Sequence, residues 1–376
     1  MNEREIAEIR RRFRPDKSNI THIRGCYVNE NREIVSQFDQ SLALMPQEDA
    51  EKILTILKRT LSGTLEKNLM TITFETAQVV SGEEHRLLMD LRESALENQE
   101  TVQAFFDKVI QAVSIQGNYL ILLACDKYDV PYRSRDGQNN EDAASEVFSY
   151  FLCSICPVKM TKPALGYYVN ENTFHNCSID WLVSPPELGF LFPAFDDRST
   201  NIYNALYYSR NAAENHPEFV QAVFQAPAPM PAQEQKETFG AILGQTLSQE
   251  CSLEVMQTVH ETLCTVIEEH KANREEVPLA VSKDTVKRVL TSCGVDPQRV
   301  QAFEEKYAEE FGEDASLSPK NLVDAGRLEV VTPSVKIQVS PQCGHMVESR
   351  VIDGVKYILI RADEGVQVNG VDVHIS

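Results

Sequence analysis

Apolar and polar positions alternate along the first 224 residues in two periods, one typical of helices and the other of strands. Spacings of three and four between apolar side chains predict amphipathic helices. These spacings occur in residues 1–14, 46–63, 82–96 and 100–113. Residues 143–156 are also apolar and end at Pro157, so we predict a further helix there.

Strands are predicted where β-branched and aromatic residues form short runs. The runs lie in residues 20–38, which we expect to form a hairpin, and in residues 69–74, 118–131, 164–169 and 180–183. Because helices and hairpin-linked strands are mixed along the chain, we predict an α+β fold rather than a doubly wound parallel sheet.

The pattern changes after a proline-containing segment with the sequence QAPAPMPAQ, which is typical of a semi-rigid linker. Beyond it, acidic residues accompany helical spacing, and the last fifty residues contain Asp-Gly and Asn-Gly hairpin signals. We therefore divide the chain into an α+β domain, a Pro/Ala linker, an acidic helical segment and a β-hairpin unit, at residues 1–224, 225–233, 234–325 and 326–376.

A group of five polar residues, DDRST at 196–200, lies between two aromatic segments in GFLFPAFDDRSTNIYNALYYSRN. We predict a turn that joins two strands, because Asp, Ser and Thr side chains bond to turn backbones. The alternative is a catalytic site in which Asp196, Asp197 and Arg198 hold a divalent cation or an anion. Two carboxylates after the buried strand are its candidate companions, Asp126 and Asp129.

The net charge is −20, from 36 basic and 56 acidic residues, and it opposes non-specific binding to phosphate backbones or anionic lipid. The first 24 residues are an exception, with seven basic and four acidic side chains, a balance of 7 − 4 = +3. Arg10, Arg11, Arg12 and Arg14 are the centre of this basic segment. We favour the solvated face of a helix for them, and the alternative is a docking arm for an acidic partner or nucleic acid.

Cysteine and histidine positions give one weak candidate for a metal site. Cys153 and Cys156 form a C-x-x-C pair, and His175 and Cys177 follow, so the residue types are those of a zinc site. The pair lies in the apolar segment that we predict to be helical, where free cysteine behaves as a small hydrophobe. We therefore favour core packing and expect no metal. No G-x-G-x-x-G, G-x-x-x-x-G-K-[ST] or G-x-S-x-G motif occurs, and we expect no cofactor.

Two helical features are similar to functional motifs, and a structural role fits each of them better. Residues 283–312 form a helix–turn–helix pattern, but its second helix is acidic and would be repelled by DNA, so we predict a packed helical hairpin. His260, Glu261 and Cys264 lie within one helical turn and could bind a metal. We interpret them as the polar face of an amphipathic helix.

The N-terminal residues are charged and carry no secretory signal, and the longest apolar run, residues 119–125, is too short to span a bilayer. Nine scattered cysteines fit free thiols in a reducing compartment. We therefore expect a cytoplasmic protein without membrane association.

Several segments resemble a bacterial family of uncharacterised proteins that share a domain of unknown function. They are ITHIRGCYVN, LSGTLEKNL, GNYLILLACDKYDVP, ICPVK, GFLFPAFDDRSTNIYNALYYS and QKETF, and the resemblance spans nearly the whole chain. It implies no particular activity.

The C-terminal third is also similar, in order and pattern, to the tail of bacterial nucleoid-associated proteins of the 37-kilodalton type. VDPQRVQAFEEKYAEEFGEDASLSPKNL, GRLEVVTPSVKIQVSP and VIDGVKYILI carry this similarity. It implies an association with nucleoid DNA but assigns no binding residue. We therefore expect a non-catalytic binding or assembly protein whose partner is a nucleic acid or a protein. The alternative is a metal-dependent hydrolase or nuclease that uses Asp196, Asp197 and Arg198.

Overall fold

A computed structural model describes residues 1–133, 139–161, 164–177, 181–273, 278–363 and 365–374, with the backbone alone at 132–133, 139–145, 164 and 177. The chain forms two compact units, Met1–Pro231 and Ala232–Ser376. Each unit buries its own apolar side chains in a separate core.

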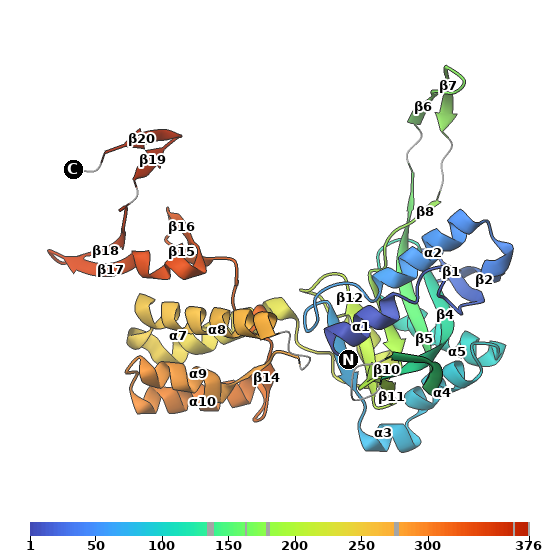
Figure 1. Cartoon of the computed structure of the whole chain (residues 1–376), viewed down its shortest axis with the longest axis horizontal. Coiled ribbons are helices and arrows are strands. Elements are labelled where there is room, and N and C mark those ends of the chain that lie inside the picture. The colour runs from blue at the N-terminus through green and yellow to red at the C-terminus, as the bar shows by residue number, and fades with distance from the viewer. Residues whose placement is uncertain (134–138, 162–163, 178–180, 274–277, 364, 375–376) are drawn as a thin grey trace. The chain divides into compact units, whose positions relative to one another are not determined.

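The first unit is built on an eight-stranded antiparallel sheet (Figure 1). Seven strands follow one another in the order β2 (Ile34–Ser41), β1 (His22–Val28), β4 (Tyr119–Arg133), β5 (Asn139–Met160), β9 (Leu188–Phe192), β12 (Asn204–Ser209) and β3 (Leu69–Thr73). The eighth strand, β8 (Trp181–Val183), pairs with the end of β5.

Helices cover both faces of this sheet and give the unit three layers. The helices on one face are α1 (Glu3–Arg10) and α2 (Gln47–Arg59). The helices on the other face are α4 (Glu83–Glu93), α5 (Gln99–Ala112) and α6 (Pro217–Phe224). A short helix, α3 (Thr76–Ser81), precedes α4. The central strands are therefore apolar on both sides, which is the pattern of a sheet with no solvated face.

Strand β5 corrects one prediction. Residues 143–156, which we expected to be a helix, belong to this 22-residue strand. Cys153 enters the apolar core on one face, whereas Leu152 and Cys156 enter the core on the other. A strand buried on both faces has no polar side, so its apolar run looks the same as that of a buried helix. Pro157, which we expected to end a helix, lies within the strand.

The other helices and strands predicted for this unit are present with small shifts. Helix α1 ends at Arg10, and residues 11–14 form turns instead of continuing the helix. Three elements had no counterpart in the predictions, α3, α6 and β7 (Thr173–Cys177). Strand β7 pairs with β6 (Ala164–Tyr168) to form a separate hairpin.

The second unit begins with helices packed around one core. They are α7 (Ala232–Leu247), α8 (Leu253–Asn273), α9 (Lys283–Ser292), α10 (Pro297–Phe311) and α11 (Pro319–Leu322), with a short pair of strands, β13 (Val281–Ser282) and β14 (Ser316–Leu317). Helices α9 and α10 form the predicted helical hairpin. Phe303 and Tyr307 of α10 are buried in the core, so this helix packs inside the unit.

Three β-hairpins complete the second unit. They are β15 (Leu328–Val331) with β16 (Lys336–Val339), β17 (Val347–Ile352) with β18 (Val355–Ile360), and β19 (Val366–Val368) with β20 (Val371–Val373). The predicted turn residues Asp353, Gly354, Asn369 and Gly370 all have positive φ, as a two-residue hairpin turn requires. The α+β fold class is confirmed. No helix in the described ranges is long and apolar enough to cross a membrane.

Candidate functional site

Residues 196–200 form the turn of a short hairpin. Strand β10 (Ala194–Asp196) pairs with β11 (Ser199–Asn201), which leaves Asp197 and Arg198 as the two turn residues. Their φ angles are 50° and 58°, the left-handed values of a type I′ turn. The side chain of Asp197 is exposed, whereas those of its neighbours face other parts of the chain.

The Asp196 carboxylate is occupied by donors from the same chain. It forms an ion pair with the Met1 ammonium group, and Oδ2 accepts hydrogen bonds from Asn201 Nδ2 at 2.7 Å and Asn204 Nδ2 at 3.0 Å. Burial alone would raise the pKa of this carboxyl, but the ammonium group and the two amides outweigh burial and lower the pKa. Asp196 is therefore ionised and saturated with partners.

Arg198 holds helix α1 against the turn. Its Nη1 lies 2.5 Å from Glu8 Oε2, and its Nη2 donates to the Pro131 carbonyl oxygen at 2.9 Å. The other Glu8 oxygen accepts a hydrogen bond from the Tyr128 hydroxyl at 2.6 Å. Burial, followed by this bond to Glu8, raises the pKa of Tyr128 to about 12. The guanidinium is thus a clamp between α1 and β4, bonded through both Nη1 and Nη2.

A second clamp lies next to the first, between the N-terminal segment and the sheet. Arg12 binds the buried Asp126 carboxylate through two bonds of 3.1 Å, from Nε to Oδ2 and from Nη2 to Oδ1. Asp126 also accepts from the Tyr150 hydroxyl at 2.9 Å and from the Asn19 backbone N–H at 3.1 Å. The Arg12 guanidinium lies 4.9 Å from the centre of the Tyr128 ring, a cation–π distance.

The structure thus places the two candidate sites side by side, because the basic N-terminal segment packs against the polar turn. Asp126 contacts Arg12 rather than Asp196, and Asp129 is exposed. Of the other arginines, Arg11 is exposed and Arg14 forms an exposed ion pair of 3.1 Å with Asp16. Arg10 is partly buried, and its Nε has no hydrogen-bond partner.

Glu146 of β5 is a member of this group that the sequence analysis did not identify. Its Oε2 accepts from the Ser199 hydroxyl at 2.8 Å, and its Oε1 accepts from the Thr200 backbone N–H at 3.1 Å. The bond from Ser199 is the main reason why the pKa of Glu146 is lowered. No sequence spacing predicts this contact, because 53 residues separate Glu146 from Ser199.

The proposed metal ligands are not brought together. Cys153 and Cys156 point into opposite cores, and burial raises the pKa of both thiols, that of Cys156 to about 12. His175 is exposed on β7 and bonds to Glu171 at 3.0 Å, and the Cys177 side chain lies outside the described residues. Among the described residues, no three His, Cys, Asp or Glu side chains form a group that could hold a metal ion.

The interpretation of His260 and Cys264 as a polar helix face is wrong, because both are buried. A ring nitrogen of His260, Nε2, lies 3.0 Å from the Asp324 carbonyl oxygen, and the Cys264 sulfur lies 3.7 Å from Nδ1. The first contact joins α8 to the segment that follows α11, and the second lies within α8. They make a structural connection inside the second unit.

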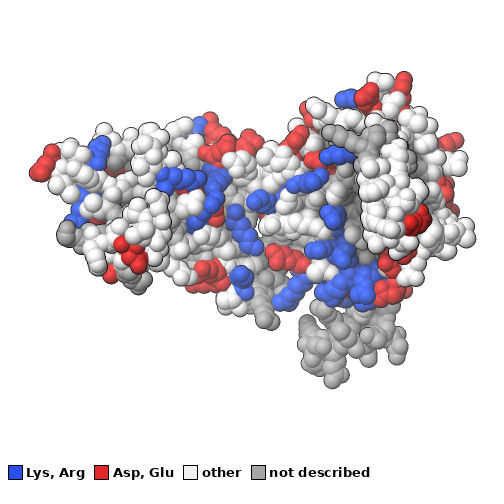
Figure 2. All heavy atoms as spheres, turned by 90° about the horizontal axis from the view of Figure 1, so that it is seen from above, with Lys and Arg blue, Asp and Glu red and all other residues white. Residues whose placement is uncertain are grey.

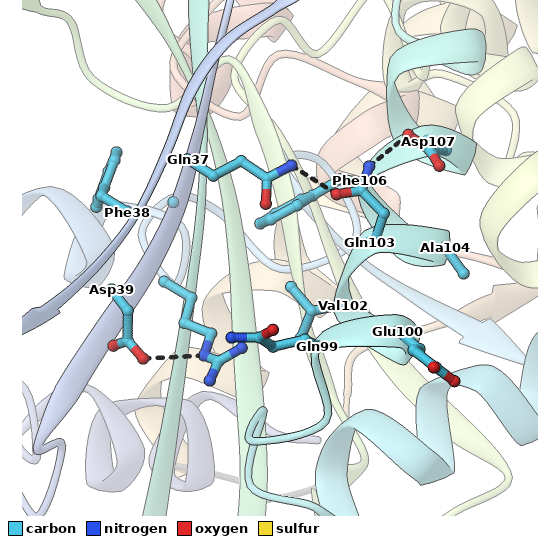
Figure 3. A pocket seen from close by; sticks show the side chains of 12 residues that line it. Gln37, Phe38, Asp39, Gln99, Glu100, Val102, Gln103, Ala104, Phe106 and Asp107 are labelled. Atoms are coloured by element: carbon cyan, nitrogen blue, oxygen red, sulfur yellow. Dashed lines mark hydrogen bonds and ion pairs between the residues drawn. The ribbon is translucent and has the colours of Figure 1, made fainter.

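A cavity of about 710 Å³ lies between the β1–β2 hairpin and helix α5 (Figure 3). Gln37 donates to Gln103 at 2.6 Å, and Gln103 donates to Asp107 at 2.8 Å. Arg24 pairs with Asp39 at 3.3 Å. These polar groups of the lining bond to one another, and the described lining contains no Ser, Cys, Lys or His.

Comparison with known families gives one match. A family model described as "Domain of unknown function (DUF4317)" matches residues 1–371, which confirms the family resemblance read from the sequence. No curated protein matches the chain.

Proposed function

The chain belongs to the DUF4317 family, and we propose that it is a non-catalytic binding or assembly protein. The observation that supports this proposal most directly is the state of the polar turn. Asp196 and Arg198, two of the three groups that a catalytic site would use here, are bonded to residues 1–19 and to the sheet. A group that is held by fixed intrachain partners is a poor ligand for a substrate or metal, because binding would first have to break those bonds.

Nucleoid DNA is the partner that we propose to test first. The sequence of the C-terminal third resembles nucleoid-associated proteins in its pattern. In the N-terminal segment, basic side chains are exposed to solvent. Although Arg12 is engaged by Asp126, the side chains of Arg11, Arg14 and Lys17 are exposed. Figure 2 shows Lys and Arg side chains gathered on one face of the first unit, although the whole chain is acidic. Such a group supports phosphate contacts that salt weakens.

The test is fluorescence anisotropy of labelled double-stranded DNA, and of RNA, titrated with the full chain at two salt concentrations. We expect saturable binding that weakens with salt, and a loss of roughly tenfold or more in affinity for the triple variant Arg11→Glu/Arg14→Glu/Lys17→Glu. A matched control, Lys52→Glu/Arg59→Glu/Lys67→Glu, reverses three other exposed cations of the same unit. Equal losses in both variants, or no binding by the natural chain, would contradict the DNA proposal.

The same experiment also tests the alternative, a hydrolase or nuclease, which one observation supports. Asp197 is the one carboxylate of the turn that is exposed to solvent. With Mg²⁺ or Mn²⁺ in the titration, cleavage of the labelled strands by the natural chain and not by Asp197→Ala would establish catalysis and overturn the non-catalytic proposal.

A further inference from the structure

The β6–β7 hairpin carries large apolar side chains that no described helix or strand covers. Leu165, Val169 and Phe174 are 71%, 79% and 64% exposed, and Tyr167 and Tyr168 are about half exposed. In Figure 1 the two strands stand next to each other with no helix over either face. An isolated two-stranded hairpin is marginally stable in water, so an uncovered one of this composition is expected to pack against something.

Further exposed apolar residues lie before and after the hairpin along the chain. Met160, at the end of β5, and Trp181 and Leu182 of β8 are each more than half exposed. Strand β8 pairs with β5 along one edge only, so its other edge is available. With about half of each side chain exposed, these residues together present on the order of 800 Å², counted over both faces of the hairpin and over β5 and β8. The face that carries Leu165, Tyr167 and Phe174 is one part of this exposed apolar area, which exceeds an ordinary surface patch.

Charge favours a second copy of this chain over an anionic partner. Residues 159–183 contain two lysines, one aspartate and one glutamate, a balance of 2 − 2 = 0, whereas the whole chain carries −20. A neutral hairpin gains nothing from DNA phosphates or anionic lipid. Between two acidic chains, however, a neutral segment is where contact meets the least electrostatic repulsion.

The register of the hairpin makes it suited to self-pairing. Tyr167 lies opposite Phe174 with ring centres 5.0 Å apart, and Leu165 lies two residues before Tyr167, on the same face. A single apolar face that packs against its own copy about a twofold axis is an isologous interface, the commonest kind in homodimers.

We propose that the β6–β7 hairpin packs against the same hairpin of a second copy, through the face that carries Leu165, Tyr167 and Phe174, and that this contact makes the protein a dimer. The proposal does not depend on DNA binding, because none of the cations of the N-terminal segment takes part in it. Dimerisation and DNA binding can therefore each fail without the other.

Light scattering coupled to size-exclusion chromatography tests the proposal on the full chain. We expect twice the mass of one chain for the natural protein at micromolar concentration, and the mass of one chain for Tyr167→Glu/Phe174→Glu. A matched control, Val351→Glu/Tyr357→Glu, changes exposed apolar residues of the β17–β18 hairpin and is expected to stay dimeric. A monomeric natural chain, or a Tyr167→Glu/Phe174→Glu variant that remains a dimer, would overturn the proposal.

The single tryptophan, Trp181, follows the hairpin along the chain and supplies a second measurement. Its emission is expected to shift to longer wavelength when the natural chain is diluted, because dissociation returns the indole to water. Tyr167→Glu/Phe174→Glu is expected to show the dissociated spectrum at every concentration. An emission that ignores dilution and shifts only on addition of DNA or neutral lipid vesicles would overturn self-pairing and identify another occupant. Circular dichroism verifies that the variant is folded, since both substituted side chains are exposed.

Discussion

The turn at residues 196–200 and the β6–β7 hairpin are both short hairpins of the first unit, and their surroundings are opposite. The turn is rich in charged groups, and nearly all of them bond to other parts of the chain. The hairpin is rich in apolar groups, and no described element covers them. What points to function here is chemistry that the fold leaves unsatisfied, rather than an unusual sequence. On that criterion the turn is structural, and the hairpin is the surface for which we propose a partner.

The largest expected effect would come from the clamp next to the turn. Asp126→Ala leaves the mostly buried Arg12 guanidinium and the Tyr150 hydroxyl without their partner, and should lower the free energy of unfolding by about 3 kcal/mol. Urea unfolding followed by Trp181 emission measures the first unit specifically, because no other tryptophan is present. Asp129→Ala, at an exposed neighbour, should change it by less than about 0.5 kcal/mol. Equal effects would mean that the clamp is not what holds the N-terminal segment.

The ion pair that joins α1 to the turn should contribute less to the free energy of unfolding. Glu8 and Arg198 are about one-fifth exposed, and their side chains lie 2.5 Å apart. A double-mutant cycle with Glu8→Ala and Arg198→Ala should give a coupling free energy of about 1–2 kcal/mol in urea unfolding. The exposed pair of Arg14 and Asp16 is the control, with an expected coupling below about 0.5 kcal/mol. A coupling free energy near zero for Glu8 and Arg198 would mean that Glu8 does not hold the guanidinium, which would then be available to a ligand.

Acid should weaken the turn in a way that depends on Glu146. Because its pKa is lowered in the folded state, Glu146 contributes stability above its unfolded pKa of about 4.3. This contribution is lost as pH falls through the lower, folded value. Glu146→Gln should therefore lose less stability than the natural chain when unfolding is measured from neutral pH down through about pH 4. Ser199→Ala, which removes the main hydrogen bond to Glu146, should change the acid dependence in the same direction, and an unchanged acid dependence in both variants would contradict the prediction.

The sequence predicted the architecture better than the environment of individual side chains. The Asp-Gly and Asn-Gly turns follow from local backbone chemistry, so they were found from the sequence alone. Strand β5 was missed because the helices on the two sides of the sheet bury both of its faces and remove the alternation that marks a strand. The contact between Arg12 and Asp126 spans 114 residues, and no periodicity encodes such a distance. For the same reason, the exposure of Leu165 and Phe174 could not be read from their apolar character.

The smallest expected change in the free energy of unfolding tests whether Asp197 is a turn residue or a catalytic residue. Its φ of 50° is a conformation that glycine adopts without steric cost and that other residues adopt less readily. Asp197→Gly should therefore raise the free energy of unfolding slightly, by about 0.5 kcal/mol, while the Glu8–Arg198 pair is kept. Gln40→Gly, at an exposed strand residue, is the control and should be destabilising, since glycine weakens a strand. If Asp197→Gly instead lowers stability or abolishes a metal-dependent activity, the carboxylate has a role that the turn does not require, and the contrast between the turn and the hairpin fails at that residue.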